Sequence, residues 1–440
     1  MRKWSAGLVV CVVFLLPVSA AAQLWLQDRA SSEGPGFKLG DSMVLHLGLG
    51  AEGGYDTNAV YRSDDVVDAG RLRITPYIDL ATRGDQRRVK DEGVVDATPP
   101  KASFKLGVAG FWDQYFAEEQ RVKDVSDFGI DTHLDFVLFP EGNFSLLLDA
   151  VYLRTLQPYE SASDARARQQ VEPGIGVRVR PGGGTLSLEL GYRLRFMYFE
   201  DDVLGDQNNR HGHEARFETR WKVFPKTALI GRVTFTPTVY YESDSMNENS
   251  LPVRSWAGLQ GLFTDRFGLM LLGGYGASFY NAGPNFDSFL ARGELMFFIT
   301  PFSQIRLGGQ RDFVDSFYAN FYVKNGGYLS YQQMIGGVVM LTLKGDVFYR
   351  DYARFDGPTF NGAIPSHQER NDVWAEGSLL VEWRATDWLS FHASGKYTGD
   401  ITDFYYQSTY EDPSTGTQTT VETDAGFHKF VVLGGVRGHY

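Results

Sequence analysis

The chain has 440 residues, a formal net charge of −12 and one cysteine, and 14% of its residues are aromatic. The acidic charge argues against a nucleic-acid partner, because nucleic acids are bound by neutralising their phosphates with lysine and arginine. The single cysteine, Cys11, excludes a disulfide framework. After residue 22 no unbroken apolar run reaches the ~20 residues that a membrane-spanning helix needs.

The first 22 residues have the three parts of a secretory signal. Arg2 and Lys3 are basic, residues 8–16 are apolar, and small residues at positions 20–22 provide a cleavage site. We therefore expect a cleaved signal peptide at residues 1–22. A short periplasmic leader is expected at residues 23–41, and a single β-barrel domain at residues 42–440.

Residues 186–199 alternate between apolar and polar side chains with almost no break. The even positions are all leucine, tyrosine or phenylalanine, whereas the odd positions include Glu189, Arg193 and Arg195. Successive side chains of a strand point to opposite faces, so this segment is an amphipathic β-strand. Its apolar face would contact either lipid or the core of a soluble sandwich.

About 18 such segments follow one another along the chain. Their connections alternate between tight turns, such as residues 140–143 and 181–184, and long polar loops, such as residues 200–212 and 400–426. Short periplasmic turns and long outer loops are typical of transmembrane β-barrels. We therefore predict an all-β, antiparallel barrel of the bacterial outer membrane, which ends at Tyr440 and has both termini in the periplasm. The barrel assembly machinery and outer-membrane lipid are the expected partners.

The polar faces of three consecutive segments carry the candidate functional residues. They are Arg178, Arg180, Glu189, Arg193, Arg195, Glu214, Arg216, Glu218 and Arg220. In one interpretation they form a basic wall of a water-filled lumen, which would guide an anionic polymer or small anions. In the other they form a ladder of ion pairs, each worth only ~0–1 kcal/mol when solvated. The two interpretations are compatible, because arginines outnumber glutamates on this wall.

Other candidate sites are weaker. His211 and His213 lack a third metal ligand, and the acidic loop at residues 200–209 does not have the spacing of an EF-hand calcium loop. Aromatic residues near loop ends, including Tyr280 and Phe404, would either stack on sugars or belong to an aromatic girdle at the membrane interface. No catalytic signature is present, so we expect no enzymatic activity, no cofactor and no metal.

One segment resembles a known family. Residues 55–62 read Tyr-Asp-Thr-Asn-Ala-Val-Tyr-Arg, and residues 315–322 form a second aromatic-rich stretch. Together they resemble the β-barrel porin 2 family, although Ala59 is an insertion relative to its pattern. The resemblance implies export of a capsular polysaccharide or exopolysaccharide, with a separate periplasmic export partner. The alternatives are a general or weakly anion-selective diffusion porin and a structural or adhesive surface barrel with a closed lumen.

Overall fold

The computed structural model describes residues 36–40, 42–82, 101–156, 167–200, 208–242, 248–316, 319–354, 364–365, 369–411 and 418–440. The expected signal peptide and most of the expected leader lie outside these ranges. Within them, no helix is both long enough and apolar enough to cross a bilayer.

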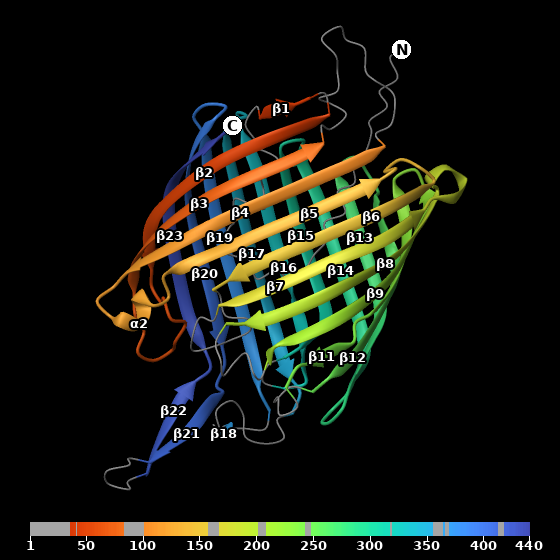
Figure 1. Cartoon of the computed structure of the whole chain (residues 1–440). Coiled ribbons are helices and arrows are strands. Elements are labelled where there is room, and N and C mark those ends of the chain that lie inside the picture. The colour runs from red at the N-terminus through yellow and green to blue at the C-terminus, as the bar shows by residue number, and fades with distance from the viewer. Residues whose placement is uncertain are drawn as a thin grey trace.

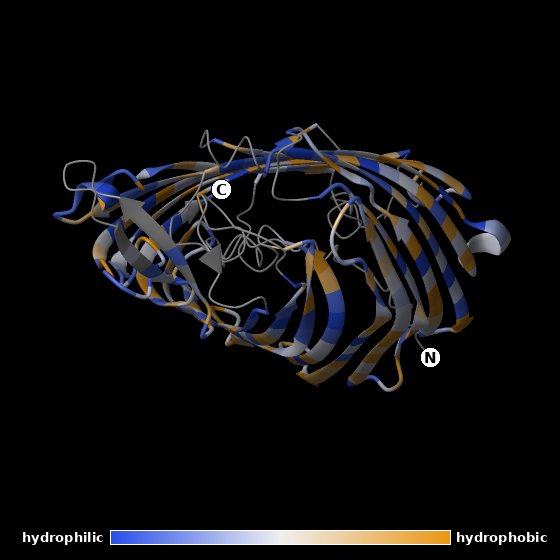
Figure 2. Cartoon of the chain, turned by 90° about the horizontal axis from the view of Figure 1, so that it is seen from below, coloured by the Kyte–Doolittle hydropathy of each residue, from blue (hydrophilic) through white to orange (hydrophobic). Residues whose placement is uncertain are grey.

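The strands form one closed antiparallel sheet, and the ribbon closes into an oval ring when viewed along the barrel (Figures 1 and 2). The first half of the wall contains β2 (Met43–Asp56), β3 (Ala69–Thr82), β4 (Ala102–Phe116), β5 (Asp127–Leu138), β6 (Phe144–Thr155), β7 (Arg168–Val179), β8 (Leu186–Phe199) and β9 (Arg210–Phe224). The second half contains β10 (Thr227–Phe235), β11 (Thr238–Tyr240), β12 (Ser250–Leu262), β13 (Phe267–Tyr280), β14 (Phe286–Thr300), β15 (Ser303–Asp315), β16 (Phe321–Ile335), β17 (Val339–Tyr352), β19 (Asn371–Arg384), β20 (Leu389–Ile401) and β23 (Phe427–His439).

The barrel has 18 wall strands, which confirms the expected fold and strand count. β10 and β11 count as one strand, because both pair with β9 and β12 and only a short break separates them. Among the described residues, the connections include the short helix α2 (Gln120–Lys123) and the 3-10 turn η3 (Pro181–Gly184).

The first and last wall strands close the ring. β2 pairs with β23 from Gly48 opposite His439 to Asp56 opposite Val431. Beyond that register, the terminal residue Tyr440 exchanges two backbone hydrogen bonds with Leu47. The short strand β1 (Phe37–Leu39) pairs with the start of β2, and the Phe37 ring lies 4.3 Å from the Tyr440 ring. The described start of the chain and its C-terminus therefore lie at the same end of the barrel, opposite the long loops.

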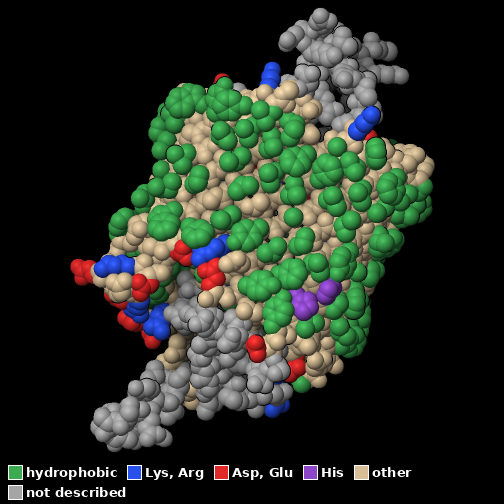
Figure 3. All heavy atoms as spheres, viewed as in Figure 1, with side chains coloured by type: hydrophobic (Ala, Val, Ile, Leu, Met, Phe, Trp, Pro, Cys, Tyr) green, Lys and Arg blue, Asp and Glu red, His purple; other side chains and the backbone are tan. Residues whose placement is uncertain are grey.

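The apolar face of each strand points outwards. In β8, Leu190 is 62% exposed on the outside, whereas Arg193 on the inner face is only 8% exposed. On the face shown in Figure 3, hydrophobic side chains predominate along the length of the strands. This arrangement answers the question left open by the alternation: the apolar faces are not the core of a sandwich, and they match the lipid-facing surface of a transmembrane barrel.

The long loops contain more structure than the sequence indicates. The expected loop at residues 200–212 is shorter, because β9 already begins at Arg210. The expected loop at residues 400–426 contains a hairpin of β21 (Tyr405–Glu411) and β22 (Gln418–Asp424), to which β18 (Ile364–Pro365) adds a short third strand. These strands were missed because their polar, threonine-rich residues give no apolar alternation.

Outward-facing tyrosines near the loop end of the barrel share one arrangement. Each hydroxyl reaches a polar side chain on the outer surface: Tyr192 with His213 at 2.5 Å, Tyr397 with His428 at 2.8 Å, Tyr198 with Tyr241 at 3.3 Å, Tyr152 with Gln169 at 3.3 Å, and also Tyr55 with Asp68 and Tyr275 with Asp287. Tyrosine is enriched where the lipid hydrocarbon meets the headgroups, because its ring is apolar and its hydroxyl can be solvated there. This tyrosine girdle occupies the outer surface from the middle of the strands to their loop ends.

Candidate functional site: the polar lumen

The structure brings the expected charged wall together on three adjacent strands. In β7, β8 and β9 the charged residues occupy the positions opposite to the outward apolar ones, so they face the lumen. Arg178 lies opposite Glu189, Glu189 lies opposite Glu218, and Arg193 lies opposite Glu214. Arg195, Arg216 and Arg220 share the same face, and Arg180 lies in the turn that follows β7.

Most of these residues form cross-strand ion pairs at the middle of the wall. Arg178 and Arg216 both bind Glu189 at 2.8 Å, and Arg195 binds Glu214 at 2.5 Å. This observation supports the ion-pair interpretation for the middle of the barrel.

Two partners come from outside the expected residues, Asp149 and Arg232, whereas Glu172 lies on the inner face that the alternation of its strand predicts. Arg193 binds Asp149 of β6 at 2.5 Å and approaches Glu172 of β7 at 3.7 Å, while Glu218 binds Arg232 of β10 at 2.7 Å. Asp149 and Arg232 have no distinctive signal in the sequence, because only the strand register places them beside their partners.

The wall carries an excess of positive charge at its turn end, the end of the barrel where the short turns lie. Within the described part of the chain, no carboxylate lies within ion-pair distance of Arg180, Arg220 or Lys222. Arg220 faces Ser187 and Ile230 across the neighbouring strands, and Arg180 donates hydrogen bonds to the carbonyls of Pro140 and Gly142. Partial burial and the nearby charge of Arg178 lower the pKa of Arg180. The basic excess of the wall is therefore concentrated at the end opposite the long loops.

The lumen is accessible to water mainly on one side. Inward side chains of β2, β3, β19, β20 and β23 are almost completely buried, as in Arg73 and Arg437, each 1% exposed. Several inward side chains of β7 to β10 keep contact with solvent, since the side chains of Arg195 and Arg232 are 34% and 40% exposed, although others on these strands, such as Glu172 and Arg193, are buried. Water therefore reaches the basic wall, while the half of the lumen near the closing strands is filled by side chains.

Contacts across several strands fill the closed half. His392 of β20 binds Glu52 of β2 at 2.8 Å across the intervening strand β23. A Cβ on Gly435 of β23 would lie only 2.8 Å from Glu52 Cγ and 2.9 Å from His392 Nε2, so a glycine is needed there for the pair to form. Deeper in the same half, Tyr77, Ala109, Met340 and Leu380 form a buried apolar cluster contributed by four strands.

The Tyr-Asp-x-Asn segment at residues 55–58 stabilises the pairing of β2 with β23, the two strands that close the barrel. The Asp56 carboxylate accepts a hydrogen bond from the backbone N–H of Asn58, and Lys429 of β23 binds both Asp56 and the Asn58 carbonyl at 2.8 Å. The Asn58 amide also donates to the carbonyls of Arg62 and His428. The residues that carry the family resemblance therefore have a structural role at the seam between β2 and β23.

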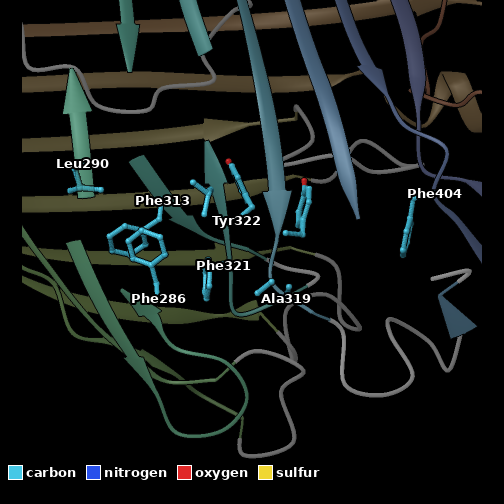
Figure 4. Packing of buried hydrophobic residues seen from close by; sticks show 10 residues of the cluster. Phe286, Leu290, Phe313, Ala319, Phe321, Tyr322 and Phe404 are labelled. Atoms are coloured by element: carbon cyan, nitrogen blue, oxygen red, sulfur yellow. The ribbon is translucent and has the colours of Figure 1, made fainter. Parts of the chain in front are cut away.

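The tip of the β15–β16 hairpin packs inside the loop end of the barrel (Figure 4). Pairing of β14 with β15 stops at Ala291 and Arg311, although β14 extends back to Phe286 and β15 extends to Asp315. Beyond that point the Phe313 ring stacks on the inward Phe286 ring at 4.1 Å.

The cluster around this tip also contains Phe404, which is buried, and Tyr280 packs against it. These two aromatic residues therefore belong to neither of their expected sites: they do not form an exposed sugar-stacking track, and they are not part of the outer girdle. Sequence alternation could not reveal this, because the position of a hairpin tip depends on where its pairing with the neighbouring strand ends.

No group of three or more histidine, cysteine, aspartate or glutamate side chains in the described part of the chain is arranged to hold a metal ion. An open cleft of about 340 Å³ beside the β21–β22 hairpin is lined largely by carboxylates, namely Asp64, Asp403, Glu422 and Asp424. Most of the acidic loop considered for calcium, residues 201–207, lies outside the described residues.

No family model matches the sequence, and neither does any curated protein. Among solved structures, the chain is similar to OpdK of Pseudomonas aeruginosa with vanillate, at 11% identity and a TM-score of 0.45, over 90% of this chain and 99% of that chain. It is also similar to OccK2 (OpdF) of the same organism in complex with glucuronate, at 12% identity and a TM-score of 0.47, over 90% and 98%. For OccAB4 of Acinetobacter baumannii the values are 10% and 0.46, over 90% and 98%.

Proposed function

We propose that this chain is an outer-membrane channel through which small anionic solutes diffuse, with both termini in the periplasm. The apolar outer wall and its tyrosine girdle are those of a barrel embedded in lipid. A barrel of 18 strands is also wide enough to enclose an aqueous channel. Such passage requires no chemical step, so we propose no enzymatic activity for the chain.

The main support is the combination of charge and exposure along β7 to β10. The solvent-accessible side of the lumen is also the side on which arginine outnumbers carboxylate. A wall of one charge sign, in a channel with low-dielectric sides, raises the local concentration of counter-ions. Anions are therefore favoured over cations, most strongly at the turn end, where Arg220 and Lys222 have no carboxylate partner among the described residues.

Export of a polysaccharide has less support than diffusion of small anions. It depends on the family resemblance, and the segment that carries the resemblance has a structural role at the seam. A separate periplasmic export partner would be needed only for this reading. It predicts that deletion of the gene removes a surface polysaccharide, whereas the diffusion channel predicts that the polysaccharide stays intact.

Ion selectivity in planar lipid bilayers tests the proposal. In a tenfold KCl gradient, the reversal potential of the wild-type channel is expected to indicate preference for chloride. The double variant Arg220→Glu/Lys222→Glu should shift the reversal potential towards that of a cation-selective channel. Lys226→Glu is the matched control. Lys226 lies in the exposed turn between β9 and β10, and it is paired with Asp265 at 2.6 Å.

The outcomes separate the alternatives. A cation-selective wild-type channel, or a double variant with unchanged selectivity, would rule out the basic wall as the selectivity element. A folded, inserted protein without measurable conductance would instead favour the structural or adhesive barrel with a closed lumen.

A further inference from the structure

We propose that the outer surface of β8, β9 and the end of β11 binds the phosphorylated sugar headgroup of an outer-leaflet glycolipid. The binding surface is a set of six outward-facing side chains, which we call the outer patch: Tyr192, Phe196, Tyr198, His211, His213 and Tyr241. This inference rests on the outer-membrane location proposed above, but it does not depend on transport through the lumen.

Four rings of the outer patch form a closed circuit of near-parallel planes. Phe196 and Tyr198 are 6.4 Å apart with planes 6° from parallel, and Tyr198 and Tyr241 are 6.0 Å apart at 11°. Tyr241 and His211 are 5.2 Å apart at 29°, and His211 returns to Phe196 at 6.5 Å and 31°. The negative faces of such neighbouring rings suit the C–H groups on one side of a sugar ring.

Polar atoms lie at the edges of this aromatic surface. The Tyr198 and Tyr241 hydroxyls are 3.3 Å apart. His213 Nδ1 lies 2.5 Å from the Tyr192 hydroxyl, and the His211 ring is 5.5 Å from the His213 ring. Imidazole N–H groups and phenol hydroxyls donate hydrogen bonds, so this edge is suited to phosphate oxygens.

The position of the outer patch points to a lipid headgroup as the occupant. All six side chains are on the outer face: Tyr192 lies at the middle of β8, and the other five lie nearer the loop end of the barrel. Histidine side chains are visible among hydrophobic ones low on the face shown in Figure 3. Polar groups on a lipid-facing wall are costly unless they meet polar partners, and headgroups are the partners available at this level.

A neighbouring cluster extends the polar surface and carries one more carboxylate than cation. Arg154 faces outwards on β6, where its guanidinium binds Asp127 at 2.7 Å and Glu200 at 2.6 Å. Gln169 of β7, which lies opposite Tyr198 in the sheet, donates to Glu200 at 2.9 Å. Because Arg154 is already neutralised by two carboxylates, the imidazoles of the outer patch are the donors left for a phosphate.

The chain provides a matched control on another part of its wall. His428 of β23 also faces outwards, and it bonds to the hydroxyl of Tyr397 at 2.8 Å with the two rings stacked. It therefore has the same residue pairing and the same girdle level as His213, but no second histidine and no ring circuit beside it among the described residues.

The test measures retention of lipid by the purified full-length barrel in detergent, using native mass spectrometry. The probes are bis-phosphorylated lipid A, its dephosphorylated form, and phosphatidylglycerol. The variants are His211→Gln/His213→Gln and Tyr198→Leu/Tyr241→Leu, with His428→Gln as the control. Folding of each variant is checked by its heat-dependent migration in gels, and either double variant suffices if the other does not fold.

The wild type and the control are expected to retain bis-phosphorylated lipid A equally, and each double variant about tenfold more weakly. The inference is overturned if the double variants bind like the wild type, or if removal of the phosphates leaves wild-type binding unchanged. It is also overturned if the outer patch instead supports a dimer that the double variants abolish. The same variants should keep the chloride preference in bilayers, so a failure of the channel proposal and a failure of this one would be distinguished.

Discussion

Lys429 Nζ lies 2.8 Å from Asp56 Oδ2, and this ion pair joins the last wall strand of the barrel to the first. Both side chains are almost completely buried, at 5% and 0% exposure. Asp56 also lies 3.7 Å from Arg71, so two cations offset its charge at the seam. A buried carboxylate that loses its partner is left with an uncompensated desolvation cost.

We therefore expect Lys429→Met to destabilise the folded barrel by about 3–5 kcal/mol, towards the lower end because Arg71 remains. The free energy of unfolding should be measured by tryptophan fluorescence during denaturant titration in lipid vesicles. Lys226→Met is the control: its pair with Asp265 is exposed, so its loss should cost no more than about 1 kcal/mol. Equal effects of the two variants would contradict a role of Lys429 at the seam.

The two faces of β8 and β9 should respond differently to a change of charge. Leu190→Arg places a cation on the lipid-facing surface, which costs ~2–4 kcal/mol near the midplane, so insertion into vesicles should be impaired. Arg220→Leu should insert normally and reduce chloride preference, because Arg220 faces the lumen without a carboxylate partner among the described residues. Arg193 is a poorer choice for this comparison, since it is buried and paired with Asp149. Similar insertion yields for the two variants would mean that the face assignment is wrong.

Cysteine labelling should reveal the one-sided lumen. Cys11, the only cysteine, lies in the expected signal peptide, so the exported barrel is expected to carry no native thiol and single-cysteine variants can be made directly. Ser187→Cys faces the open half beside Arg220 and should react rapidly with a water-soluble thiosulfonate, which would also reduce the channel current. Ser390→Cys replaces a side chain of the closed half that is 0% exposed, and it should react far more slowly. Comparable labelling rates would show that water fills both halves.

Acid should weaken the loop end of the outer wall through Glu200. The hydrogen bond from Arg154 holds the pKa of Glu200 below its ordinary value. Because the pKa is lower in the folded state, protons bind the unfolded state more tightly, and the stabilisation is lost as the pH falls below about 4.3, the ordinary value for glutamate. Glu200→Gln should therefore unfold at a lower denaturant concentration than the wild type at pH 6, with the difference shrinking towards pH 3. A difference that does not change with pH would contradict this role of Glu200.

The sequence identified most of the wall and little of what lies inside it. Alternation places Leu190 and Arg193 on opposite faces wherever the strand lies, because the side-chain period of a strand is fixed by its backbone geometry. The inward direction of Arg178, Arg193 and Arg216 followed from that period alone. Their pairing with Asp149, Glu189 and Glu172 depends on register, which the alternation of a single strand does not contain.

The sequence by itself therefore determined an antiparallel barrel with apolar and charged faces, since a local two-residue period repeated about 18 times leaves few other folds. Only the tertiary structure decided which half of the lumen is open to water, because contacts such as His392 with Glu52 join residues 340 positions apart in the chain. It also placed His211, which was expected in a loop, on the outer surface of β9 beside His213. Their neighbours Tyr192 and Tyr241 come from β8 and the end of β11, the strands adjacent to β9, and only the register of these strands brings them together.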